Sequence, residues 1–159
     1  MKITLSKIKY NADFSEETHC FKAIVNIDGV PLFAVENEGH GGSNRYGYIN
    51  QGGMTVIDVD DWCINNLPKQ TTNLKNKDGS DFIMPTDLDM VIIDLLNDYL
   101  LTKELNRKMR LCWIVSDGES LYKIKKSGKE GQLERVAAKY IVLNSLSPSS
   151  CLEMYKQQT

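Results

Sequence analysis

The residues best suited to chemistry lie in one glycine-rich stretch, from Asn37 to Tyr46. Within it, a titratable imidazole sits among three glycines and is flanked by an acid, two amides, a guanidinium and a phenol. Glycine costs conformational entropy, so this density predicts backbone angles or close approaches that a side chain would forbid. The candidate ligand- or partner-binding residues are therefore Asn37, Gly39, His40, Gly41, Gly42, Asn44, Arg45, Tyr46 and Tyr48.

This glycine loop is open to four interpretations. Successive backbone N–H groups could cradle a phosphate, although the spacing matches no known phosphate fingerprint. An H-G-G oxyanion element would need a G-x-S-x-G nucleophile, which the chain lacks. His40 could act as a general base beside Glu36 or Glu38. The fourth interpretation is a rigid turn that His40 and Asn44 close with hydrogen bonds. Because the four interpretations stay open, we assign no catalytic residue.

Metal-binding patterns are weak. His19 and His40 would need to converge with a carboxylate to hold a metal. An acidic cluster at a predicted helix start could bind Mg²⁺, but the helix dipole already favours acids there; its members are Asp58, Asp60 and Asp61. The cysteines have no C-x-x-C pair, and no structural disulfide is expected; they are Cys20, Cys63, Cys112 and Cys151. Cys20 and Cys112 lie in apolar, strand-like surroundings and are expected to be buried. The sequence therefore predicts no metal and no cofactor.

Charge and aromatic residues bear on the kind of partner. The 159-residue chain has a net charge of −2 and a pI near 5.7, which argues against a dedicated duplex-DNA binder. Arg45 with Tyr46 and Tyr48 could stack on a base or anchor a protein partner. Two local basic clusters could form a basic face or simply be solvated; they are Lys103, Arg107, Lys108 and Arg110, and Lys123, Lys125, Lys126 and Lys129.

The first third of the chain predicts strands, which would position the glycine loop. Met1 to Tyr10 predicts a strand, and His19 to Ile27 predicts another with every second residue apolar. Asp28-Gly29 is a strong hairpin signal, and Val30 to Val35 is the returning strand. The glycine loop follows at the far end of this hairpin, so paired strands would hold its entrance.

The middle of the chain predicts helices. A short helix is expected over Asp58 to Leu67, followed by an exposed loop over Gln70 to Asp81. The clearest helix runs from Thr86 to Lys108, with Thr86 as the N-cap and Asp89 completing an acidic capping box.

The last third predicts a second hairpin and short elements. Strands are expected over Leu111 to Ser116 and Leu121 to Lys125, a short helix over Leu133 to Tyr140 and a brief strand over Ile141 to Leu143. A flexible tail with a weak helical turn is expected from about residue 148. The fold class is α+β: a mostly antiparallel sheet with one long helix and one or two short helices against it, in a single domain over residues 1–159.

The chain shows no signal-peptide pattern and no apolar run of the ~20 residues that a membrane span needs. We therefore expect no membrane partner and a location in the cytoplasm.

The loop resembles that of a family of short, uncharacterised proteins from phages and prophages. Their N-x-G-H-G-G-x-N-x-Y loop follows a D-G hairpin and is matched by Asn37, Gly39, His40, Gly41, Gly42, Asn44 and Tyr46. The family also resembles this chain before the hairpin, from Ser15 to Ala23, and again from Lys139 to Asn144. The resemblance implies a phage accessory protein, and such small proteins often bind and disable a host or rival factor.

The leading hypothesis is stoichiometric binding to a bacterial host or defence protein, as an inhibitor of a defence system. The first alternative is a module that binds a nucleotide or another small anionic ligand through the loop over Gly39 to Gly42 and Arg45. A weaker alternative is a hydrolase that uses His40.

Overall fold

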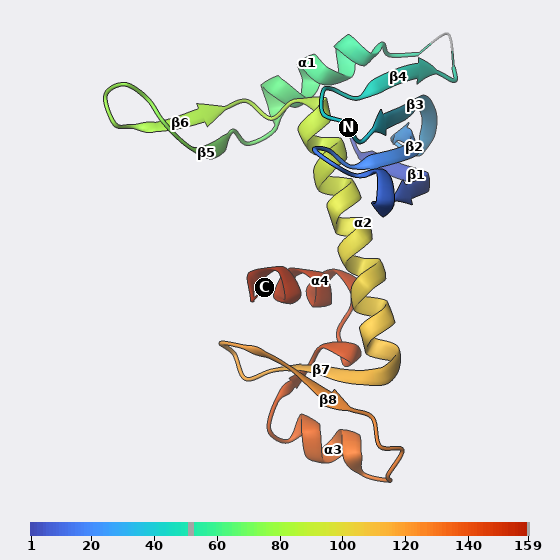
Figure 1. Cartoon of the computed structure of the whole chain (residues 1–159), viewed down its shortest axis with the longest axis vertical. Coiled ribbons are helices and arrows are strands. Elements are labelled where there is room, and N and C mark those ends of the chain that lie inside the picture. The colour runs from blue at the N-terminus through green and yellow to red at the C-terminus, as the bar shows by residue number, and fades with distance from the viewer. Residues whose placement is uncertain (51–52, 159) are drawn as a thin grey trace. The chain divides into compact units, whose positions relative to one another are not determined.

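A computed structural model describes residues 1–50 and 53–158 of the chain (Figure 1). Its contacts divide the chain into two compact units, Met1–Leu96 and Asn97–Thr159, and each is described by itself below. Every pair of strands within the described residues is antiparallel, and the longest helix has 24 residues. The predicted α+β class, with antiparallel pairing and one long helix, is confirmed.

Unit 1 is built on a four-stranded sheet in the order β1-β2-β3-β4. The strands are β1 (Ile3–Asn11), β2 (Cys20–Ile27), β3 (Val30–Glu38) and β4 (Arg45–Tyr48), and a 3₁₀ turn, η1 (Ala12–Phe14), follows β1. The alternation predicted for β2 is confirmed, since its buried residues include Phe21, Ala23, Val25 and Ile27. One face of this sheet therefore belongs to the core, and the other faces out.

The turn between β2 and β3 is the predicted Asp28-Gly29 hairpin. Both residues have positive φ, at +50° and +86°, which is the geometry of a type I′ turn. Pro31 lies at the start of β3, where the missing N–H costs the sheet least.

Two helices complete the core of unit 1. Helix α1 (Val56–Asn66) begins earlier than predicted, because Thr55 is its N-cap and Asp58 closes a capping box with it. Its Val59 and Cys63 are fully buried. Helix α2 (Leu88–Leu111) lies in unit 1 up to Leu96 and is the predicted long helix.

The capping box predicted at Thr86 and Asp89 is wrong. The Thr86 hydroxyl donates a hydrogen bond to the Pro68 carbonyl at 2.6 Å and does not cap α2. Asp87 Oδ1 accepts from the Met90 N–H at 2.8 Å instead. The Asp60 carboxylate, from α1, accepts from the Leu88 N–H at the same distance. Asp89 is thereby left available for a different contact.

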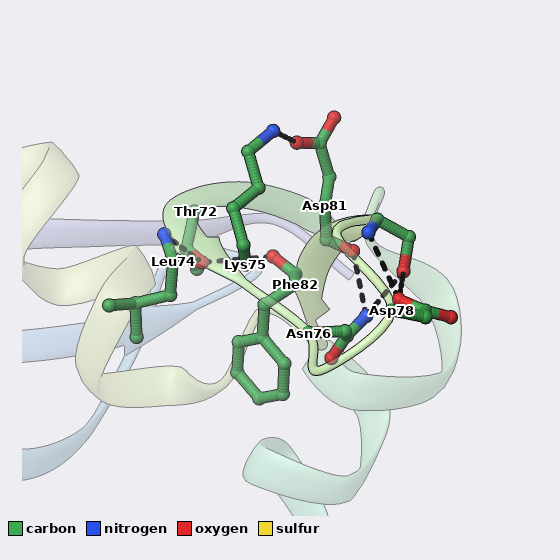
Figure 2. A network of polar contacts seen from close by, with 8 residues as sticks. Thr72, Leu74, Lys75, Asn76, Asp78, Asp81 and Phe82 are labelled. Carbon is green, nitrogen blue, oxygen red and sulfur yellow. Dashed lines mark hydrogen bonds and ion pairs between the residues drawn. The ribbon is translucent and has the colours of Figure 1, made fainter.

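The segment over Gln70 to Asp81, predicted as a loop, belongs to a hairpin of β5 (Gln70–Lys75) and β6 (Asp81–Met84). Polar contacts hold it together: the Thr72 hydroxyl donates to the Phe82 carbonyl, and Lys75 forms an ion pair with Asp81. Figure 2 shows the Leu74 and Phe82 side chains on one side of the hairpin and the ion pair on the other. The loop prediction was wrong because it relied on the low content of apolar residues, whereas polar side chains stabilise this pair of strands.

Unit 2 has a three-stranded sheet in the order β8-β7-β9. Its elements are β7 (Cys112–Ser116), β8 (Leu121–Lys125), α3 (Gln132–Ala137), β9 (Ile141–Val142), the 3₁₀ turn η2 (Leu143–Ser145) and α4 (Pro148–Gln157). The part of the chain expected as a tail forms α4, capped by Ser147, with Cys151 and Tyr155 buried. These two side chains pack with Leu105 of α2 and Ile114 of β7.

None of the helices within residues 1–50 and 53–158 combines the length and the hydropathy that crossing a bilayer requires.

Candidate functional site

The glycine loop connects β3 to β4 and uses its glycines for their backbone freedom. Gly39, Gly41 and Gly42 have φ of +92°, +91° and +88°, in the region that side chains disfavour. A β-carbon on Gly39 would lie 1.9 Å from the Phe14 carbonyl oxygen and 2.9 Å from Cys20 Cβ. The prediction of unusual backbone angles or close approaches is confirmed: all three glycines have a positive φ, and Gly39 also makes a close approach.

Asn37 organises the loop from beneath. This amide is only 7% exposed. Its Oδ1 accepts from the Thr18 hydroxyl at 2.8 Å and from the Gly39 N–H at 2.9 Å. Its Nδ2 donates to the Gly42 carbonyl at 3.2 Å and to Asn44 Oδ1 at 3.3 Å. One buried side chain thus ties both ends of the loop together.

The segment before β2 fastens the loop from the other side. The Gly39 carbonyl accepts the backbone N–H groups of Glu16, Glu17 and Thr18 at 3.0, 3.0 and 3.2 Å. The Thr18 hydroxyl in turn accepts from the Gly41 N–H at 3.2 Å. The N–H groups of Gly39 and Gly41 are therefore engaged within the protein.

Asp89, at the start of α2, anchors the far end of the loop. Its carboxylate accepts from the Asn44 N–H at 3.3 Å and from Asn44 Nδ2 at 2.9 Å. The Tyr46 hydroxyl also donates to it. Burial, followed by the hydrogen bond to Asp89, raises the pKa of the Tyr46 phenol. Asn44 and Tyr46 therefore serve first to hold the loop onto the helix.

His40 lies at the surface of the loop. Its side chain is 57% exposed, and Nδ1 is 3.1 Å from Glu16 Oε2. The carboxylate beside His40 is thus Glu16 and not Glu36 or Glu38, which contact other partners. Of the two residues predicted to close the turn, Asn44 hydrogen-bonds to Asn37 and Asp89, and His40 contacts Glu16 in the segment before β2.

A row of charges crosses the outward face of the sheet beside the loop. Lys22, Glu36 and Arg45 are paired across three neighbouring strands. Lys22 Nζ is 2.6 Å from Glu36 Oε2, and Arg45 Nη2 is 3.2 Å from Glu36 Oε1. Arg45 also pairs with Glu38. The hydrogen bond from Lys22, with the charges of Lys22 and Arg45, lowers the pKa of Glu36. We call these four residues the ionic row.

A recess of about 540 Å³ adjoins the ionic row. Its wall combines charged and apolar side chains, with the ring of Phe14, 57% exposed as a residue, beside the half-buried Cys20. His40 contributes to the same wall. This combination resembles the lining of binding sites, where apolar surface supplies contact area and a few charges orient the ligand.

The predicted site residues separate into two groups. Successive residues of a strand face opposite sides, so Arg45 joins the ionic row while Tyr46 faces Asp89. Tyr48 shares the side of Tyr46 and packs edge-on against Phe33, with ring centroids 5.5 Å apart. Arg45 and the two tyrosines therefore do not form one continuous anchor surface.

Three contributors to the site were not predicted. Thr18 and Asp89 hold the loop, and Lys22 completes the ionic row. The residues weighed as metal ligands have other roles: Asp58 and Asp60 cap helices, and His19 packs edge-on against Tyr10. Within residues 1–50 and 53–158, no three His, Cys, Asp or Glu side chains are grouped to hold a metal ion.

The raised pKa of Tyr46 predicts a loss of stability at high pH. The unfolded chain releases the phenolic proton near pH 10, whereas the folded protein retains it, so stability falls as the pH rises above about 10. We expect the melting temperature of Tyr46→Phe to fall less than that of the wild type between about pH 9.5 and 11.5. Tyr48→Phe is the matched control, since it removes a phenol from the same strand without touching Asp89. Equal slopes for the wild type and Tyr46→Phe would contradict the prediction.

We compared the chain with known proteins, and no protein-family model, no curated protein and no solved structure matches it.

Proposed function

We propose that the protein acts by stoichiometric binding to a bacterial protein, as a phage-encoded accessory protein in the cytoplasm of the host cell, and that its target belongs to a defence system. The phage origin rests on the sequence resemblance of the loop. The binding mode rests on one observation, the ionic row beside a mixed apolar and charged recess on the outward face of the sheet.

The ionic row suits recognition of a protein surface. Its ion pairs are solvent-exposed, and such pairs contribute little to the stability of a fold. In an interface, the same charges steer association and reject partners of the wrong charge pattern. The guanidinium of Arg45 pairs with two carboxylates, and arginine is enriched among the residues that dominate binding energy.

The rigid loop supports the same proposal. Asn37, the Gly39 carbonyl and Asp89 fix the backbone between β3 and β4 before any partner arrives. A surface that is already ordered loses less entropy on binding, so preorganisation raises affinity. The loop would then act as the support of the binding face.

The alternatives are less well supported by this geometry. An anion cradle needs free backbone N–H groups, but those of Gly39 and Gly41 already donate to Asn37 and Thr18. A hydrolase would rely on His40, whose neighbour Glu16 is itself exposed. Both alternatives remain predictions that the following experiment separates from binding.

The test is to capture bacterial proteins on the chain of residues 1–159, purify the captured protein and titrate it calorimetrically. We expect a fixed molar ratio and saturation, with no substrate consumed. Arg45→Ala should weaken the complex about thirtyfold or more if Arg45 anchors the interface, while circular dichroism and the melting temperature stay close to wild type.

Lys69→Ala is the matched control, since it also removes one exposed positive charge from unit 1 but is not part of the ionic row. Equal weakening by both variants would show that net charge, and not the ionic row, controls binding. Activity at a small fraction of the target concentration would reject stoichiometric binding and make His40 the first residue to mutate.

A further inference from the structure

The recess beside the ionic row has a floor whose side chains all belong to one face of the sheet. Two sets of residues lie directly opposite one another across β1, β2 and β3; they are Lys9, Lys22 and Glu36 in the first set and Asn11, Cys20 and Glu38 in the second. Directly opposite residues of an antiparallel pair share a face, and the two sets are two residues apart along each strand. These six side chains therefore share the outward face, and all of them line the recess.

Lys9 lies directly opposite a like charge. Both Lys9 and Lys22 are exposed, and Lys22 Nζ is already 2.6 Å from Glu36 Oε2. The other carboxylate of the recess, Glu38, pairs with Arg45. Within the described part of the chain, no carboxylate forms an ion pair with Lys9. Like charges directly opposite each other destabilise a strand pair, so an anion between the two ammonium groups would relieve that repulsion.

An exposed aromatic ring lines the same recess. Phe14, in η1, is 57% exposed. Ser15 fixes the turn that carries it: the Ser15 hydroxyl donates to the Asn11 carbonyl at 2.7 Å and accepts from the Cys20 N–H at 2.9 Å. The ring is thus attached to an ordered backbone, and a second aromatic ring could pack against it.

The glycine loop holds this turn from the other side. The Phe14 carbonyl oxygen is only 1.9 Å from where a β-carbon of Gly39 would lie, so the two segments are in close contact. The Gly39 carbonyl also accepts the N–H groups of Glu16 and Thr18 at 3.0 and 3.2 Å. His40, the next residue, lines the recess. Both η1 and the glycine loop therefore contribute to the recess before a ligand arrives, which lowers the entropic cost of binding.

The charges of the recess favour a ligand group with a single negative charge. A carboxylate between Lys9 and Lys22 would compensate the one cation that has no counter-charge. A dianionic phosphate would also face Glu36 and Glu38, which line the same recess, and like charges brought together oppose binding. The recess therefore suits a carboxylate better than a phosphate.

We propose that the recess binds an acidic residue and an adjacent aromatic residue of the partner protein. The carboxylate lies between Lys9 and Lys22, and the aromatic ring packs on Phe14 and Cys20. This inference rests on the proposed function, because it names the part of the partner that the outward face recognises.

The test is an NMR titration of the isotope-labelled chain of residues 1–159 with the peptide acetyl-Glu-Phe-amide. We expect saturable shifts of the backbone amides around the recess, such as those of Cys20 and Lys22. Acetyl-Gln-Phe-amide, which lacks the charge, and acetyl-Glu-Ala-amide, which lacks the ring, should each bind about fivefold more weakly.

Two variants assign each half of the peptide to its contact. Lys9→Gln should weaken acetyl-Glu-Phe-amide about fivefold and leave the affinity for acetyl-Gln-Phe-amide unchanged. Phe14→Ala should weaken acetyl-Glu-Phe-amide about fivefold and leave the affinity for acetyl-Glu-Ala-amide unchanged.

Lys7→Gln is the matched control, since it removes one exposed positive charge from the same strand at a position that does not line the recess. It should bind acetyl-Glu-Phe-amide as the wild type does. Without peptide, Lys9→Gln should keep or raise the melting temperature, because it removes a like charge opposite Lys22. A lysine that served only the fold would lower the melting temperature when replaced.

Several results would overturn the inference. They are the absence of shifts up to the solubility limit of the peptide, equal affinity for acetyl-Glu-Phe-amide and acetyl-Gln-Phe-amide, equal weakening by Lys7→Gln and Lys9→Gln, and tighter binding of inorganic phosphate. A captured protein that binds Lys9→Gln and the wild type equally would also overturn it, while the proposed function stands. Peptide binding at the recess without any captured protein would support the ligand chemistry and reject stoichiometric binding to a bacterial protein.

Discussion

Gly39→Ala is expected to lower the free energy of unfolding by about 4 kcal/mol. Two costs combine in this change. The residue would have to keep a φ of +92°, and its β-carbon would lie 1.9 Å from a backbone carbonyl oxygen of η1. Since that oxygen belongs to Phe14 and not to a flexible side chain, the loop and the segment before β2 would have to move apart. Urea unfolding followed by circular dichroism measures the loss.

Gly42→Ala is the matched control for this prediction. Its φ of +88° is almost the same, but a β-carbon there meets nothing within 4 Å, so only the backbone strain of about 1 kcal/mol is expected. Gly41 should be intermediate, because its neighbour is the movable carboxylate of Glu17. Replacing Gly41 or Gly42 by Val should still be more damaging than His40→Ala, which alters an exposed side chain. Equal losses at Gly39 and Gly42 would show that the close approach is unimportant.

The second large effect is expected at Asn37. Asn37→Ala removes four hydrogen bonds from a buried amide and leaves partners such as the Gly39 N–H unsatisfied. A loss of about 3 kcal/mol follows, because a buried polar group without a partner carries its full desolvation cost. Amide hydrogen exchange at Gly39 and Gly41 should accelerate, which reports on the loop itself.

Asn26→Ala serves as the comparison for Asn37. Asn26 is equally buried, at 8% exposed, and its Nδ2 donates to the Thr4 and Ile24 carbonyls and to the Ser6 hydroxyl. Its loss should destabilise the sheet without accelerating exchange at the glycine loop. If both variants changed exchange in the loop equally, the assigned role of Asn37 would be wrong.

Much of the fold could be predicted because its signals are local. The Asp28-Gly29 turn, the alternation along β2 and the apolar stripe of α2 each depend on neighbours within a few residues. The prediction of the capping box at the start of α2 was wrong for the opposite reason. Its caps come from Asp87 and from Asp60 on another helix, and the second of these is a tertiary contact that no local pattern reveals.

The site was only partly predictable for the same reason. The glycines predicted an unusual backbone. The pairing of Lys22 with Glu36, however, depends on the register between β2 and β3, and the position of the turn alone predicts the wrong register. Counting outward from the hairpin pairs Lys22 with Val35, and an irregularity after Val25 shifts the pairing by one residue. Such a shift changes which side chains share a face, so the ionic row could not be inferred from spacing.

The central position of Asn37 separates what the loop needs for folding from what the neighbouring face presents to solvent. The Asn37 amide and the backbone groups of the glycines in the motif satisfy one another, so these residues of the motif are a requirement for folding. The charges of the ionic row lie partly outside the motif, on β2 and β3, and are free to change without disturbing it. The loop can therefore keep its architecture while substitutions in the ionic row change the charge pattern of the outward face.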